Sequence, residues 1–285
     1  MTKMKNLKRS IQRLGFKVVI LLLFLPVLSC NSMVVFASDQ QDWDAIFGAL
    51  SRHDDVVMHQ NAGAISWEQM DKLAMEDDAR LGDFYWIENI RHFRDSYVMY
   101  SSVCTHRLTI SYIYNKQEAD AMERKLRSVV RKLHLDGKSD AQKAEAIYRY
   151  IINHVEYDHE ALSAEERQVS HTAYGALMNG KAVCQGYSLL YLRMAYEAGL
   201  EAKYISGTSD YGTGGGGHAW NIVKIGKRYY NVDVCWDDNG FYDADENRYF
   251  LLNDKDFKHH TRDAMYASQE FTSKYRRAKR SYHHK

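Results

Sequence analysis

The stretch that decides the fold is "HAWNIVKIGKRYYNVDVCWDD", residues 218–238. Apolar and β-branched residues flank the dipeptide Gly226-Lys227 on both sides. This arrangement predicts a β-hairpin that turns at the dipeptide, and therefore antiparallel sheet in this part of the chain.

With the turn centred there, the hairpin pairs Trp220 with Asp233 and His218 with Cys235. Directly opposed residues share a face, and the strand period of two keeps His218 on the face of Trp220. His218 and Asp233 then become diagonal neighbours, close enough for an imidazole to reach a carboxylate. The alternative is a satisfied histidine beside a surface aspartate.

A run of four glycines, residues 214–217, leads directly into this hairpin. It is followed by a strand pattern and not by Lys-Ser/Thr and a helix, which excludes a phosphate-binding loop. Glycine lets another chain pass close to the backbone, so we interpret the run as a loop beside a cleft, with Gly217 at its edge. A plain linker is the alternative.

Residues 182–199, "AVCQGYSLLYLRMAYEAG", predict a helix with one apolar face and Gly199 at its end. Cys184 falls in the first turn, where unpaired N–H groups and the helix dipole stabilise a thiolate. With His218 as a base and Asp233 to orient it, the sequence offers the groups that thiol catalysis needs. A buried core cysteine is the other interpretation.

Four segments together carry a resemblance to a known family. They are "SDAQKAEAIYRYIINHVEYD", "TAYGALMNGKAVCQGYS", "GHAWNIVKIGKRYYNVDVCWDD" and "RYFLLNDKDF", in that order between residues 139 and 257. They resemble the transglutaminase-like superfamily of papain-fold cysteine enzymes, in its bacterial secreted branch. The resemblance implies that Cys184 is the nucleophile, His218 the general base and acid, and Asp233 the residue that orients the imidazole. Cys235 stands where the family usually has threonine.

The resemblance also implies further parts of a site. A side chain just upstream of the cysteine completes the oxyanion hole in relatives, which makes Tyr174 the candidate here, beside the backbone N–H of Cys184. The candidates for lining the cleft are Trp220, Trp236, Gly217 and Gln185.

The implied reaction is acyl transfer from a peptide or protein amide through a thioester. Water as acceptor gives a protease or amidase, and a lysine amine gives a transglutaminase; no residue chooses between them. A binding module that has lost the chemistry is the rival.

The fold class that these patterns predict is α+β. An N-terminal α+β region is expected over residues 38–136, with helical spacing near residues 43–50 and strand alternation over residues 108–114. The catalytic domain follows over residues 137–262, opened by a helix whose capping box is Ser139 with Gln142. Residues 263–285 form a basic C-terminal tail.

Residues 1–37 read as an export signal. A basic start precedes a compact apolar core, Val18 to Leu28, and a small-residue cleavage site precedes Ser38. Cys30, after Val-Leu-Ser, alternatively resembles a lipidated cysteine. We therefore expect a secreted protein, either cleaved before Ser38 or lipid-anchored at Cys30.

Positive charge is concentrated at the C-terminal end of the mature chain. The last fourteen residues hold six Lys or Arg and no acid. For an exported protein this favours contact with anionic cell-wall polymer or a membrane surface over nucleic acid. No C-x-x-C or H-E-x-x-H spacing is present, so the sequence predicts no metal and no cofactor.

Overall fold

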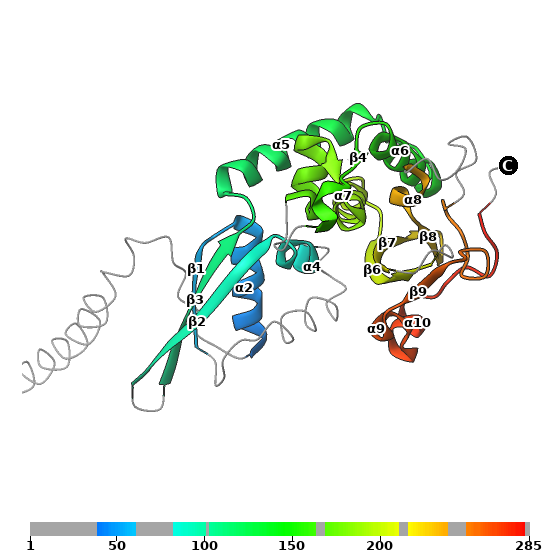
Figure 1. Cartoon of the computed structure of the whole chain (residues 1–285). Helices are drawn as coiled ribbons and strands as arrows, with labels where there is room; N and C mark the ends of the chain where they lie inside the picture. The colour runs from blue at the N-terminus through cyan, green and yellow to red at the C-terminus, as the bar shows by residue number, and fades with distance from the viewer. Residues whose placement is uncertain are drawn as a thin grey trace, which may run out of the picture. The chain divides into compact units, whose positions relative to one another are not determined.

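The computed structural model describes residues 39–60, 82–100, 103–163, 169–210, 216–238 and 249–282 (Figure 1). The chain divides into two compact units. The first comprises residues 1–65 and 92–110, and the second comprises residues 66–91 and 111–285. The predicted boundary at residue 137 lies within the second unit, between two of its helices. Among the described helices, none has the length and apolar character needed to cross a membrane.

The first unit pairs one helix with a small antiparallel sheet. Helix α2 (Asp39–Arg52) packs on β1 (Val56–His59), which pairs with β3 (Val103–Tyr112), and β2 (Ile90–Tyr100) lies on the other side of β3. The register places Val57 opposite Leu108 and His59 opposite His106. Ile46, Leu50 and their helical neighbours bury the apolar stripe that the sequence predicts.

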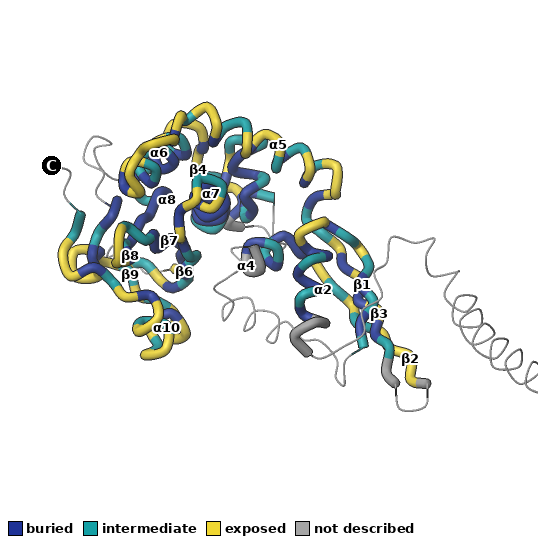
Figure 2. The backbone as a smooth tube through the Cα atoms, turned by 180° about the vertical axis from the view of Figure 1, so that it is seen from behind, coloured by how far each residue is buried: buried dark blue, intermediate teal, exposed yellow. Residues whose placement is uncertain are grey.

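The second unit is built around one buried helix, α7 (Cys184–Glu197). Figure 2 shows it as a largely dark blue tube among the other helices and the sheet. Around it lie α4 (Gly82–Ile87), α5 (Lys116–Lys132), α6 (Asp140–Ile152) and α8 (Val234–Asp238). The capping box of Ser139 and Gln142 at the start of α6 is confirmed. The backbone N–H of Ser139 donates to the side-chain oxygen of Gln142, and the backbone N–H of Gln142 donates to the hydroxyl of Ser139.

An antiparallel sheet covers α7 on one side. Its strand order is β8-β7-β6-β9, formed by β6 (Ala202–Ser209), β7 (Gly216–Ile225), β8 (Arg228–Val232) and β9 (His260–Arg262). Short pieces precede α7: β4 (Glu156–Tyr157), β5 (Lys181–Ala182), and the turns Glu160–Ser163, Val169–His171 and Gly175–Asn179. Helices joined to an antiparallel sheet confirm the α+β class.

The hairpin prediction is correct in register but too long. Asn221 pairs with Val232 and Ile225 with Arg228, so the turn lies at Gly226-Lys227 as predicted. Pairing stops at Val232, and α8 begins two residues later. Asp233 and Cys235 are therefore not strand partners of Trp220 and His218, which corrects the predicted pairs.

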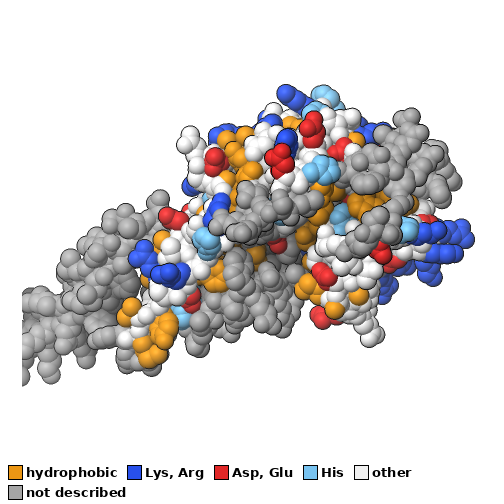
Figure 3. Space-filling model, viewed as in Figure 1, with side chains coloured by type: hydrophobic (Ala, Val, Ile, Leu, Met, Phe, Trp, Pro, Cys, Tyr) orange, Lys and Arg blue, Asp and Glu red, His pale blue; other side chains and the backbone are white. Residues whose placement is uncertain are grey.

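The C-terminal segment is folded where we expected a basic tail. Helices α9 (Ala264–Ala267) and α10 (Gln269–Lys274) follow β9, and Tyr275 and Ala278 are buried. The backbone of Tyr229 on β8 bonds with Arg276 and Ala278 at 3.0 and 2.9 Å. Lys and Arg side chains gather at this end of the second unit (Figure 3).

Candidate active site

Helix α7 presents Cys184 as its first residue, with its side chain half-buried. The helix is fixed to the sheet by Asn221 of β7, whose Nδ2 donates to the carbonyl of Ser188 at 3.1 Å. Gly186 allows the segment before the helix to approach closely, because a Cβ there would lie 2.4 Å from the carbonyl oxygen of Ser170. The start of α7 is therefore held from two sides.

His218 of β7 lies between the thiol and a carboxylate. Its Nε2 donates to Oδ2 of Asp233 at 2.6 Å, and its side chain is 5% exposed. Cys184 lies close enough to the same ring to influence its charge, and both residues line one cleft. The structure thus brings together the three residues that the sequence singled out.

Asp233 reaches this position because it ends a strand and starts a helix. Its Oδ1 accepts from the backbone N–H of Trp236 at 3.1 Å, the N-cap contact expected of aspartate. Its own N–H donates to the carbonyl of Tyr249 at 2.9 Å. Capping explains why the strand does not continue to Cys235, which is buried inside α8.

A second histidine, which the sequence did not indicate, completes the carboxylate's surroundings. Nε2 of His260 on β9 lies 2.8 Å from Oδ2 of Asp233, and its Nδ1 lies 2.8 Å from the carbonyl oxygen of Lys258. Its ring is 1% exposed and stacks on Phe257 with centroids 4.0 Å apart. Both nitrogens face acceptor oxygens, which fixes the orientation of the ring.

The electrostatics of the set favour a charged His218. Burial alone lowers the pKa of His218, but Asp233, and then Cys184, outweigh it and raise that pKa from 6.5 to about 10. Burial raises the pKa of Asp233, yet His218 and His260 overcome this and hold it well below its ordinary value. An anionic carboxylate between two histidines is the ground state of this cluster.

The donor atoms of His218, Asp233 and His260 all lie within 4.8 Å of one another, a spacing that a metal ion could use. These same atoms already bind each other through hydrogen bonds. Each of the three residues thus already has a partner within the cluster.

An open cleft of about 770 Å³ reaches Cys184 and His218. Three of the predicted lining residues, Gln185, Gly217 and Trp236, do line it. Trp220 does not: it is 1% exposed and packs in the core beneath the sheet. Gly216 and Gly217 belong to β7 at the cleft's edge, and the rest of the glycine run lies outside the described residues.

Tyr174 does not border the cleft and instead stacks on Tyr114, with centroids 4.7 Å apart. The oxyanion role that the resemblance suggested for it stays a prediction, and the contact that the structure shows is this packing against Tyr114. Tyr157 does border the cleft, and burial, followed by the proximity of Cys184 and Cys235, raises its pKa above the ordinary tyrosine value. It thus offers a neutral hydroxyl beside the thiol.

The family comparison agrees with this geometry. The family model of the transglutaminase-like superfamily matches residues 127–234, a span that holds Cys184, His218 and Asp233. Over these residues the chain is similar to the transglutaminase-like superfamily.

Individual relatives match part of the chain. Kyphoscoliosis peptidase of Mus musculus is 31% identical over 161 residues, or 52% of this chain and 24% of that protein. The Homo sapiens kyphoscoliosis peptidase is 31% identical over 144 residues, 47% of this chain and 22% of that protein. The match thus spans about a quarter of these relatives. A crystal structure of a TGase aligns with a TM-score of 0.38 and 16% identity, over 75% of this chain and 55% of that one.

Proposed function

We propose that the second unit is a thiol-dependent acyl-transfer enzyme that acts on peptide or protein amides. The observation that carries the proposal is the placement of Cys184 and His218 on one open cleft, with His218 hydrogen-bonded at 2.6 Å to the buried carboxylate of Asp233. A nucleophile, a base and a group that orients the base are the elements of nucleophilic catalysis.

The steps follow from these groups. The Cys184 thiolate attacks the carbonyl carbon of an amide, and the His218 imidazolium gives its proton to the departing amine nitrogen. A thioester on Cys184 remains. His218 then takes a proton from water or from a lysine amine, which attacks the thioester carbon and releases the thiolate. Asp233 holds the imidazole through both proton transfers.

Two donors are proposed for the negative oxygen of the tetrahedral intermediate. The backbone N–H of Cys184 is among the first of α7, where N–H groups have no partner within the helix. The Tyr157 hydroxyl is the second, since it lies at the cleft near the thiol. Tyr157→Phe should then lower kcat by about 100-fold while KM changes little. An unchanged kcat would remove Tyr157 from the mechanism.

The test of the reaction uses the mature chain with casein and a labelled primary amine. Mass spectrometry then reports cleavage or amine incorporation, which distinguishes hydrolysis from transfer. Cys184→Ala should abolish both products, and Cys235→Thr, which removes the other described thiol beside the cleft, should retain them. Slow alkylation of Cys184 together with no product from any amide substrate would support a binding module instead.

Export and surface attachment remain part of the proposal. Residues 1–37 lie outside the described residues, so the mature N-terminus, Ser38 or a lipidated Cys30, is to be read from the intact mass of the native protein. A basic pocket of about 520 Å³ supports an anionic partner. Its cationic lining comes from Lys203, Lys224, Lys227, Lys274 and Arg276. Binding to a wall polyanion or to anionic vesicles should weaken in Lys274→Glu.

A further inference from the structure

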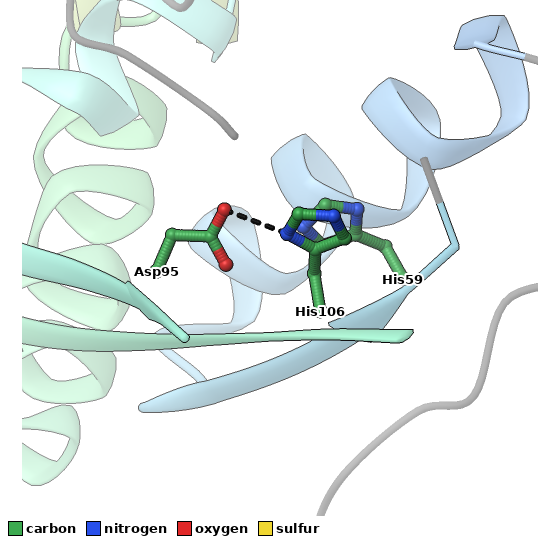
Figure 4. A group of neighbouring side chains, drawn as sticks. All are labelled: His59, Asp95 and His106. Carbon is green, nitrogen blue, oxygen red and sulfur yellow. Dashed lines mark hydrogen bonds and ion pairs between the residues drawn. The ribbon is translucent and has the colours of Figure 1, made fainter. Parts of the chain in front are cut away.

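Three potential metal ligands meet in the first unit, each on a different strand. His59 comes from β1, Asp95 from β2 and His106 from β3, and their donor atoms all lie within 4.8 Å of one another. Figure 4 shows the carboxylate of Asp95 directed at the His106 ring, with the His59 ring behind it. Asp95 Oδ2 lies 2.8 Å from His106 Nδ1, and the two imidazoles stack with centroids 4.7 Å apart.

The cluster is buried, and the burial of one member, His59, needs an explanation. The side chains of Asp95 and His106 are 7% and 2% exposed, and His59 is fully buried. Neither ring nitrogen of His59 has a hydrogen-bond partner among the residues that the structure describes. Burying a polar ring without a partner is unfavourable, so each such group calls for an explanation, and coordination of an ion is one.

The chemistry of the His59 side chain suits a metal ligand. Imidazole nitrogen is the commonest metal ligand in proteins. Both ring nitrogens of His59 lack a partner among the described residues, so binding an ion would break no hydrogen bond that they make there.

We propose that His59, Asp95 and His106 bind a divalent transition-metal ion, for which Zn²⁺ is the best fit. Imidazole nitrogen and carboxylate oxygen are both zinc ligands, at about 2.0–2.2 Å. In a tetrahedral site such bonds place ligand atoms about 3.3 Å apart. Donors already within 4.8 Å reach this spacing by side-chain rotation. His59 and His106 are register partners, so the backbone already holds them opposite each other.

The ion's role would be structural. Because its ligands come from all three strands, it would join β1, β3 and β2 from within the unit. The fourth coordination position is left for water or another group. Sequence spacing could not indicate this site, since the ligands lie far apart in the chain and match no compact zinc motif.

The test uses the full chain in a Cys184→Ala background, which removes the half-buried thiol at the cleft of the other unit. The protein is stripped with EDTA, loaded with Zn²⁺ and passed through a desalting column, and the bound metal is then measured. We expect about one Zn²⁺ per chain, and a thermal midpoint raised by roughly 5 °C or more in excess Zn²⁺. This readout does not depend on the activity proposed for Cys184.

Two substitutions localise the ion. His59→Phe keeps a ring in the stack and removes the unpartnered nitrogens, so the metal-free protein should fold and melt at or above the parent's midpoint. It should nevertheless lose the Zn²⁺-induced gain, and its affinity should fall by at least about 100-fold. His92→Gln, at an exposed histidine of β2, is the matched control and should bind Zn²⁺ like the parent.

The proposal fails if the parent retains no Zn²⁺, or if a folded His59→Phe chain binds it as tightly as the parent. If His59→Phe does not fold by circular dichroism, Asp95→Asn is judged by the same two measurements. If neither variant folds, the parent is loaded with Co²⁺. Visible absorption bands typical of tetrahedral Co²⁺ would then support the site, and their absence would overturn it.

Discussion

Replacing Asp233 by asparagine should change the pH at which Cys184 reacts. The substitution keeps the size of the side chain and its acceptor for the N–H of Trp236, but it removes the negative charge next to His218. The burial that lowers the pKa of His218 remains, and the main influence that raises it is lost. The pKa of His218 should therefore fall from about 10 to its ordinary value of 6.5 or below.

The magnitude follows from the protonated fraction of His218. At a pH two units above 6.5, a histidine with a pKa of about 10 is almost fully protonated, whereas one at 6.5 is about 1% protonated. If the reactive form is the thiolate–imidazolium pair, its population near pH 8.5 drops by about 100-fold. Poorer orientation of the ring adds to this loss.

The assay needs no knowledge of the substrate. Iodoacetamide is applied between about pH 5 and 10, and the rate at Cys184 is followed by peptide mass mapping, which separates it from the other cysteines. A protonated His218 favours the thiolate of Cys184. The parent should therefore react faster than Asp233→Asn between about pH 6.5 and 10, where the charge of the imidazole differs between the two proteins. Superimposable pH profiles for the two proteins would refute the role assigned to Asp233.

Three further predictions concern the same unit. Gly186→Ala should destabilise the fold by about 1–3 kcal/mol, because its Cβ meets the Ser170 carbonyl, whereas Gly216→Ala, with nothing within 4 Å, should leave the thermal midpoint nearly unchanged. His260→Gln should lower kcat by about 10- to 100-fold, because Asp233 and His218 are then less precisely positioned. The alkaline limb of the pH–rate profile should stay or move to higher pH, since Asp233 then interacts with His218 alone. A shift of that limb to lower pH would contradict this role. The His218–Asp233 pair should stabilise the fold most between the ordinary pKa values of 3.8 and 6.5, and lose effect as pH rises through about 10 or falls well below 3.8. The difference in thermal midpoint between parent and Asp233→Asn should therefore be larger near pH 5 than near pH 10, and a constant difference would argue against the pair.

The sequence predicted the features that local chemistry determines. The capping box at Ser139 and the hairpin turn at Gly226-Lys227 depend on residues a few positions apart, and both are present. Cys184 at the start of a helix follows in the same way from the apolar spacing after it. The hairpin register also brought His218 within reach of Asp233, although the strand pairing ends one residue before it.

Features that depend on contacts between distant segments could not be predicted from the sequence. His260 reaches Asp233 only because β9 pairs with β6, and nothing in the doublet His259-His260 indicates that pairing. Trp220 has the character of a cleft residue, but its ring is directed into the core. Strand β2 was not predicted, because its apolar residues do not alternate and much of it is exposed.

The position of β9 in the chain has a consequence for biosynthesis. Cys184, His218 and Asp233 leave the ribosome before residues 249–262, yet Asp233 receives its contacts with Tyr249 and His260 from that later segment. Until β9 pairs with β6, the carboxylate lacks part of its surroundings and the imidazole beside it is less firmly held. The surroundings of Asp233 and His218 would thus be complete, and Cys184 fully reactive, only after β9 has paired with β6.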